Sequence, residues 1–161
     1  MKIAESILNT LAEPVLLLDG AFCAVLGNPA FYQAFNIESG QLVGVPAPNL
    51  MSGASSQARL RVVLDAVRAG TPEVEGVEVK GAPSPFPPRV LSVHARRVVV
   101  VVGAPEMVLV EFRDITRERE KELRIQELND ALRLHADRLE RTNLDLESFT
   151  HSASHDLRTP L

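Results

Sequence analysis

The stretch EPVLLLDGAFCAVLGNPAFYQAF, residues 13–35, decides how the chain folds. Its apolar run from Val15 to Asp19 predicts a strand, Asp19-Gly20 has the chemistry of a hairpin turn, and Phe22 to Leu26 predicts the returning strand. Asn28-Pro29 then predicts the start of a helix, because the asparagine side chain satisfies a free backbone amide and proline has no amide to satisfy.

The segments on either side extend this hairpin into a mixed domain. Before it, Ile3, Ile7, Leu8 and Leu11 share one face of a short helix that Pro14 ends. After it, apolar spacing predicts a helix over 57–69, which Gly70 ends, and then strands over 73–80, 89–102 and 106–115. Hairpins at both ends around a short helical crossover predict an α+β fold rather than an alternating βαβ fold. The helices cover one face of the sheet, and the N-terminal helix or a second subunit covers the other.

Composition excludes several classes of protein. The 161 residues are 45% hydrophobic and 24% charged with a net charge of −4, which is typical of a folded domain and lacks the basic surface of a nucleic-acid-binding protein. Cys23 is the single cysteine, so we expect no internal disulfide and no zinc site. Glu5 falls where a secretory signal would be apolar, and the apolar stretch 98–110 is interrupted and too short for a membrane span. We therefore expect a cytoplasmic protein without a transmembrane segment.

The chain changes character at Thr116. All nine glycines and ten of the eleven prolines precede Arg117, whereas 18 of the 45 residues from Arg117 to Leu161 are charged. These charges are mixed in sign, which predicts a long helix that faces water.

The helix also carries a heptad pattern of apolar residues. One set recurs every seven residues, and a second follows three residues later with His135 and Thr142 as polar members. This pattern predicts a parallel coiled coil in a homodimer, weakened by the polar positions. The residues of the seam are Ile125, Leu128, Leu132, Leu139, Leu146, Phe149 and Ala153.

Residues 5–116 resemble a PAS domain in three pieces: EPVLLLDGAFCAVLGNPAFYQAF, then LVG, then the closing VLVEFRDITRERE. The resemblance implies a PAS sensor domain over 1–115 and a signalling coiled-coil helix over 116–144. It also implies that Asp114, Ile115 and Thr116 end the last strand and transfer the signal to the output helix. Thr116 suits the N-cap of that helix, and Glu118 and Glu120 place negative charge at its positive end.

The final stretch, LESFTHSASHDLRTPL, closely resembles the H-box of sensor histidine kinases, which begins the dimerisation and phosphoacceptor domain over 145–161. By this resemblance His155 accepts the phosphoryl group, and Asp156 orients the imidazole and takes its proton. Thr159 positions water for phosphatase chemistry, and Arg158 contacts phosphate. His155 lies about 200° around the helix from Ala153, and therefore points away from the seam.

The residues that bind known PAS cofactors do not match. Cys23 lies outside the motif of flavin-binding light sensors, and the helix over 57–69 lacks the histidine of haem-binding members. Flavin and haem are therefore disfavoured, and the ligand is unknown. Phe22, Phe31 and Phe35 are read as core residues rather than as a ligand cage. A metal pair of His151 and His155 is disfavoured because it offers only two ligands, so we predict no metal.

The resemblance implies the cytoplasmic sensory part of a two-component histidine kinase. Its partners would be a second copy of the chain, a response regulator receiver domain, and a small molecule or protein at the PAS domain. The chain lacks the motifs of an ATP-binding domain, so we expect it to belong to a longer protein and to be inactive as a kinase alone, with ATP and Mg²⁺ held elsewhere. Two alternatives stay open: a non-catalytic scaffold, and a ligand sensor whose output is mainly phosphatase activity.

Overall fold

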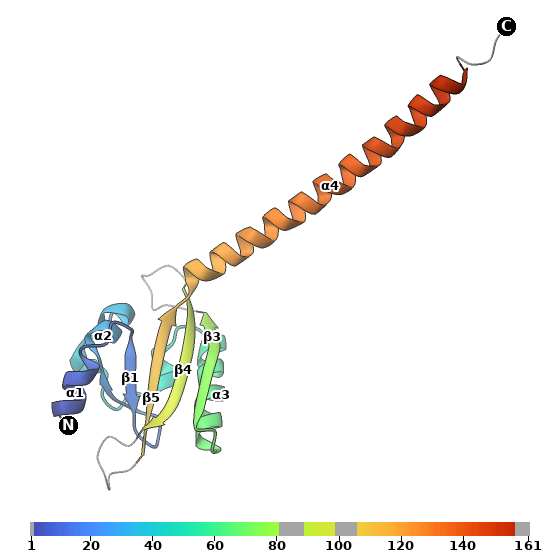
Figure 1. Cartoon of the computed structure of the whole chain (residues 1–161). Helices are drawn as coiled ribbons and strands as arrows, with labels where there is room; N and C mark the ends of the chain where they lie inside the picture. Colours follow the sequence, from blue (N-terminus) through green and yellow to red (C-terminus); the bar gives the residue numbers. More distant parts are fainter. Residues whose placement is uncertain (1, 81–88, 99–105, 157–161) are drawn as a thin grey trace. The chain divides into compact units, whose positions relative to one another are not determined.

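The computed structural model describes residues 2–80, 89–98 and 106–156. The chain divides into two compact units, Met1–Arg117 and Glu118–Leu161. The first unit contains the sheet and its covering helices. The second is formed by the continuation of one helix, α4 (Thr116–Asp156) (Figure 1).

The first unit is built on one sheet of five antiparallel strands in the order β2-β1-β5-β4-β3. Along the chain these are β1 (Val15–Leu18), β2 (Ala24–Gly27), β3 (Glu73–Lys80), β4 (Val90–Val98) and β5 (Met107–Asp114). The last strand therefore lies at the centre of the sheet, between β1 and β4. This arrangement confirms the predicted α+β class.

The predicted strands agree with the observed ones within a few residues. β3 has the predicted bounds, and β4 begins one residue later than predicted. The predicted continuation of β4 over 99–102 lies outside the described residues. So do residues 81–88 and 103–105, which the predicted strand bounds leave as connections between strands.

The first hairpin turns differently from the prediction. The Asp19 amide donates to the Cys23 carbonyl at 3.0 Å, which leaves Gly20, Ala21 and Phe22 as a three-residue loop. Phe22, not Gly20, takes the left-handed conformation, with φ of 63°. Asp19 Oδ1 closes the turn by accepting from the amides of Ala21 and Cys23, each at 2.9 Å. The Phe22 side chain is buried in the core, and this burial offsets the cost of its backbone conformation.

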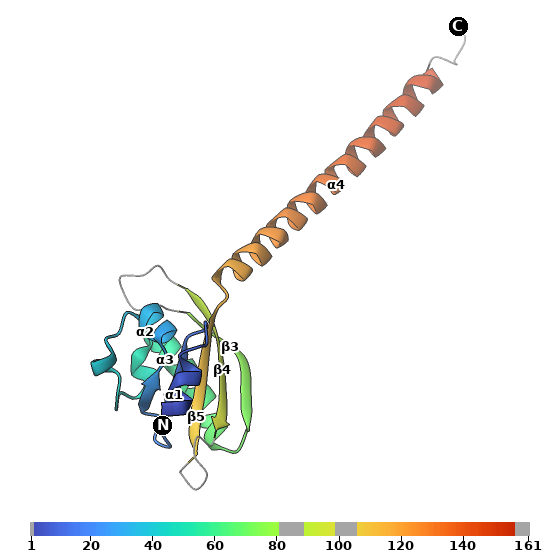
Figure 2. The ribbon, with the colours of Figure 1, turned by 60° about the vertical axis from the view of Figure 1, so that its left-hand side comes forward.

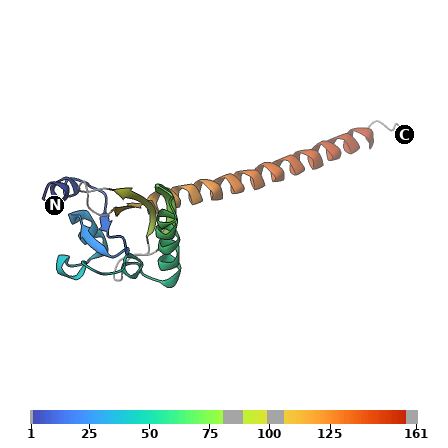
Figure 3. The same ribbon diagram turned by 90° about the horizontal axis from the view of Figure 1, so that it is seen from below.

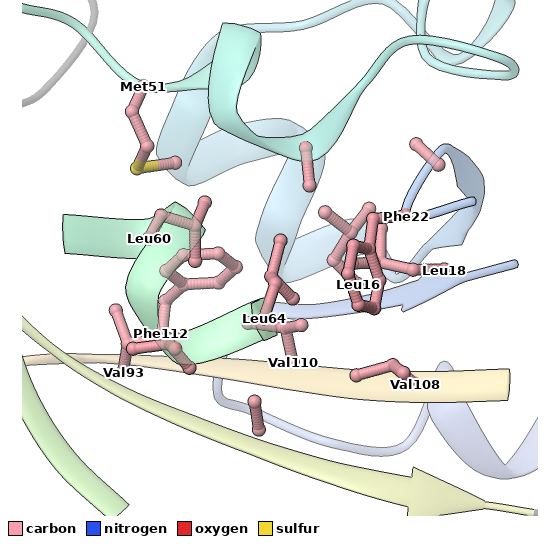
Figure 4. Close-up of a cluster of buried hydrophobic side chains, with 14 of the residues drawn as sticks. Leu16, Leu18, Phe22, Met51, Leu60, Leu64, Val93, Val108, Val110 and Phe112 are labelled. Carbon is pink, nitrogen blue, oxygen red and sulfur yellow. The ribbon is translucent and has the colours of Figure 1, made fainter. Parts of the chain in front are cut away.

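The core lies between one face of the sheet and two helices, α2 (Pro29–Phe35) and α3 (Ala54–Arg68) (Figure 3). The 3₁₀ turns η1 (Ser39–Gln41) and η2 (Ala47–Leu50) connect these helices. The predicted apolar face of α3 is buried, as Figure 4 shows for Leu60 and Leu64 against Val110 and Phe112. The buried residues of α3 are Ser56, Leu60, Val63, Leu64 and Val67.

Aromatic rings fill the centre of this core. Phe31 and Phe35 stack with ring centroids 4.4 Å apart, and Phe112 of β5 meets Phe35 edge to face at 5.1 Å. These geometries are the favourable ones for aromatic pairs. The prediction that Phe22, Phe31 and Phe35 belong to the core is confirmed.

The N-terminal helix, α1 (Lys2–Leu8), is shorter than predicted. Ile7 and Leu11, predicted to share one helix face with Leu8, are 59% and 42% exposed, whereas Leu8 is buried. On the second face of the sheet, Val15 and Leu17 are also buried. In Figure 2, α1 lies in front of the sheet.

Asn28 ties the N-terminal segment to the hairpin and to α2. Its Oδ1 accepts from the amides of Val15 and Phe31, each at 2.9 Å, which confirms the predicted N-cap. Its Nδ2 donates to the carbonyl of Glu13 at 2.8 Å and to that of Leu11 at 3.1 Å. Asn28 is completely buried, and all of these bonds are made inside the protein.

Candidate functional site

The end of β5 and the start of α4 form a hydrogen-bonded joint. Asp114 Oδ1 accepts from the Thr116 amide at 3.0 Å and from the Thr116 hydroxyl at 2.6 Å. The carboxylate thus satisfies one of the amides that every helix leaves free at its N-terminus, and its negative charge suits the positive end of the helix dipole. Glu118 places a further acidic side chain in the first turn of α4.

The joint is also attached to the beginning of β4. The Thr116 hydroxyl oxygen accepts from the Val90 amide at 2.9 Å, and the Ile115 amide donates to the Val90 carbonyl at 2.9 Å. Thr116 is therefore the first residue of α4 and bridges two segments with its hydroxyl. Thr116 was predicted to cap the helix with its own hydroxyl. The capping acceptor is instead the Asp114 carboxylate, because the Thr116 hydroxyl is already bonded to both Asp114 and Val90.

Arg89 contributes a charge to this joint. Its Nε lies 3.7 Å from Asp114 Oδ2, and the two side chains are 32% and 46% exposed. Sequence reasoning did not single out Arg89 or Val90, because both reach the joint through pairing of β4 with β5. The one available signal was the opposite charge of Arg89 and Asp114, which is too common to identify a contact.

A small cavity of about 50 Å³ lies directly beneath the joint. Phe35, Leu91 and Phe112 line it together with Arg89 and Asp114. Residues of the aromatic core and residues of the charged joint therefore line the same cavity. A change in core packing at Phe35 or Phe112 would act directly on the residues that hold the start of α4.

The second unit presents a line of exposed apolar side chains. Seam residues Leu132, Leu139 and Phe149 are 66%, 70% and 70% exposed. Such exposure of large apolar groups along one helix is typical of a surface that packs on a partner. The remaining seam residues Ile125, Leu128 and Leu146 are exposed as well, and Ala153 is half-buried.

His155 lies on the last described turn of α4 and is exposed, as is His151 one turn earlier. Leu146 precedes His155 by nine residues, which at about 100° per residue places them on opposite sides of the helix. Asp156 ends α4, and its side chain is not described. The predicted site residues Arg158 and Thr159 lie outside the described residues.

The described residues contain no group of three or more His, Cys, Asp and Glu side chains able to hold a metal ion. Within the same part of the chain, no helix combines the length and apolar character needed to cross a membrane. Cys23 is half-buried, and its backbone forms an isolated antiparallel β-bridge with Pro46.

Comparison with known proteins places this architecture among sensory domains. A family profile described as the PAS fold matches residues 8–120. A search of curated protein sequences finds no match.

Solved structures share the fold at low sequence identity. An RNA-binding light-oxygen-voltage receptor superposes with a TM-score of 0.66 at 14% identity over 80% of this chain, which covers only 37% of that receptor. The PAS domain of nitrogen regulation protein NR(II) from Vibrio parahaemolyticus gives 0.54 at 24% identity, covering 71% of this chain and 100% of that domain. A PAS domain from a two-component sensor histidine kinase gives 0.53 at 11% identity, covering 70% and 94%.

Proposed function

Because the chain belongs to the PAS fold family, we propose that it is the sensory part of a two-component histidine kinase with His155 as its phosphoacceptor. Two features support the proposal: the resemblance of residues 146–161 to an H-box, and the unbroken helix that runs from Thr116 to Asp156. The helix is the observation that carries the proposal. One continuous helix contains both Thr116 of the joint and the proposed phosphoacceptor His155.

The input of the proposed sensor is a change within the PAS unit. Phe112 and Asp114 belong to the same strand and both line the cavity under the joint. A ligand or partner that shifts the core would alter the hydrogen bonds between Asp114, Thr116 and Val90. Because these bonds hold the first turn of α4, the change passes into the helix.

The output is carried by a parallel homodimer. Seam side chains that are exposed in a single chain would be buried between two copies of α4. His135 and Thr142 interrupt the apolar seam, and the Thr142 hydroxyl bonds to the Arg138 carbonyl of its own helix at 2.9 Å. Polar seam positions weaken the coil, so that two packings lie close in free energy, as a switch requires.

The chemistry would occur on the outer side of this coil. A ring nitrogen of the exposed His155 imidazole would act as the nucleophile that attacks the γ-phosphorus of ATP. The new N–P bond forms as the P–O bond to ADP breaks, and Asp156 takes the imidazole proton. The phosphoryl group then passes to an aspartate of a response regulator. Arg158 would contact phosphate, and Thr159 would position the water that hydrolyses the aspartyl phosphate of the response regulator and releases inorganic phosphate.

ATP, Mg²⁺ and the catalytic domain that binds them are supplied from outside residues 1–161 in this proposal. The reaction would take place in the cytoplasm, where ATP and receiver domains are found. The signal is a small molecule or a protein that binds the PAS unit.

The test is phosphorylation of the whole gene product by γ-labelled ATP. We expect label that is stable to base and lost in acid, and that is absent from His155→Ala. His151→Ala is the matched control, since it removes an exposed imidazole one turn earlier on the same helix. Equal labelling of wild type and His155→Ala would refute the assignment. A folded, ATP-binding dimer without label would favour the scaffold function.

A further inference from the structure

The start of β5 borders a second, larger cavity, of about 180 Å³. We call it the Arg68 pocket; its lining includes Phe22, Val67, Arg68, Arg97, Glu106 and Val108. These residues come from the first hairpin, the end of α3 and the strands β4 and β5. Figure 4 shows Phe22 and Val108 at one end of the core cluster, away from Phe112 and Val93. The pocket is therefore separate from the cavity under the joint.

Arg97 forms a fixed part of the wall. Its Nε and Nη2 donate to the Val67 carbonyl at 3.1 Å and 2.6 Å, and its Nη1 lies 3.4 Å from Glu106 Oε2. The guanidinium thus occupies the negative C-terminal end of α3 and neutralises it. Because Arg97 neutralises this end of α3, the helix end does not repel an anion in the pocket.

Arg68 is held differently, by an aromatic ring. Its guanidinium carbon lies 4.3 Å from the centroid of the Phe22 ring, which is the geometry of a cation–π contact. Across the described ranges, the Arg68 side chain makes no hydrogen bond or ion pair with another residue. Because Phe22 covers one face of the guanidinium, its in-plane N–H donors are the groups available to a ligand.

We propose that the Arg68 pocket binds a small monocarboxylate with an apolar body. A planar guanidinium matches a carboxylate with two parallel hydrogen bonds. Phe22, Val67 and Val108 offer the apolar body of the ligand an apolar surface to pack on. Glu106, which is 63% exposed at the pocket, opposes a second negative charge and so disfavours phosphate dianions. The site does not depend on His155 and is a property of the sensor unit alone.

The volume of the pocket, about 180 Å³, matches a ligand of about one ring with its carboxylate. A cavity of about 150 Å³ is known to hold benzene, whereas pockets for drug-sized ligands begin at about 300 Å³. Benzoate is therefore a suitable probe. Benzamide and benzamidinium have nearly the same shape as benzoate. Benzamide is neutral and benzamidinium is positively charged, so comparing the three compounds separates the effect of charge from that of shape.

The experiment is a titration of the ¹⁵N-labelled chain with each compound, followed by two-dimensional NMR at about 0.15 M salt, where exposed charges are screened over about 8 Å. We expect benzoate to shift the amide signals of Gly20, Phe22 and Val67 and the Nε–H signal of Arg68 in a saturable manner. Benzamide should bind at least about tenfold more weakly, since it lacks the charge-assisted bonds. Binding of benzamidinium as tight as that of benzoate would overturn the proposal.

Two variants of opposite expected effect keep the test independent of folding. Arg68→Gln should weaken benzoate binding roughly tenfold, whereas Glu106→Gln should strengthen it a few fold by removing a like charge. Arg61→Gln is the matched control: it makes the same change at an exposed position of α3 that does not line the pocket. The proposal fails if Arg68→Gln binds benzoate as tightly as Arg61→Gln, or if Glu106→Gln weakens binding.

Discussion

The Thr116 hydroxyl oxygen accepts a hydrogen bond from the Val90 amide at 2.9 Å. The first residue of the long helix is thereby attached to the first residue of β4, twenty-six positions earlier in the chain. The same hydroxyl donates to Asp114 at 2.6 Å, so a single oxygen joins the end of β5, the start of β4 and the start of α4.

Replacing Thr116 with valine should loosen this joint. Valine keeps the shape of threonine but leaves the Val90 amide without its acceptor, which costs about 1–3 kcal/mol for a buried group and less where water reaches it. We expect faster amide hydrogen exchange at Val90 and Ile115. Thr116→Ser, which retains the hydroxyl, should restore slow exchange. Equal exchange rates in wild type and Thr116→Val would show that the bond contributes nothing to the joint.

Replacing Asn28 with alanine should destabilise the sensor unit by roughly 2–4 kcal/mol, since several backbone groups lose their partners at once. Urea unfolding followed by tyrosine fluorescence measures this effect specifically, because Tyr32, one turn into α2, is the only tyrosine and the chain has no tryptophan. Asn28→Asp tests which half of the side chain matters. It keeps the acceptor for Val15 and Phe31 but loses the donor to Glu13 and Leu11. We expect intermediate stability, and wild-type stability would contradict the role of Nδ2.

A side chain at Gly27 should reduce the stability of the sensor unit. A Cβ built there would lie 3.0 Å from side-chain atoms of both Leu42 and Phe31, which are fully buried. Gly27→Ala should therefore cost about 1–3 kcal/mol through overpacking. Gly40→Ala is the control, because no atom lies within 4 Å of its Cβ position. The comparison uses the same urea titration, and equal midpoints for the two variants would contradict the packing seen around Gly27.

The proposed coil predicts that seam and non-seam leucines respond differently. Leu139 and Leu134 are both exposed in the single chain, at 70% and 52%. Leu139→Asp should weaken self-association at least about tenfold, because an unpaired charge would be buried in the seam. Leu134→Asp should have little effect, since Leu134 lies about 200° from Leu132 around the helix.

Sedimentation equilibrium of the whole chain measures both dissociation constants. A wild-type chain that is monomeric at all accessible concentrations would refute the homodimer. Equal weakening by the two substitutions would instead move the contact to another face of α4.

Local sequence was sufficient where a residue acts on its own neighbours. The helix start at Asn28 and the apolar face of α3 depend on spacings of three or four residues, and both were predicted correctly. The first hairpin was predicted with the wrong turn, because the Asp19 carboxylate and the buried Phe22 ring together outweighed the conformational preference of Gly20. No local pattern reports such a balance.

Contacts that depend on strand pairing could not be predicted from the sequence. The position of β5 between β1 and β4 brings Arg89 and Val90 to Asp114 and Thr116, and nothing near those residues in the sequence announces it. The Arg68 pocket has the same origin, since its residues come from four separate segments. The seam was predicted from heptad spacing and the role of His155 from the resemblance to an H-box, and both stay predictions.

The absence of any break in α4 between Thr116 and Asp156 constrains how this protein can exchange parts with others. Inserting a single residue would rotate everything that follows by about 100° relative to Thr116, whereas inserting seven would rotate it by only about 20°. Recombination or engineering that grafts this sensor onto a foreign output domain should therefore succeed in steps of seven residues. The length of the connecting helix, counted modulo seven, is then constrained in the same way as the identity of a functional side chain.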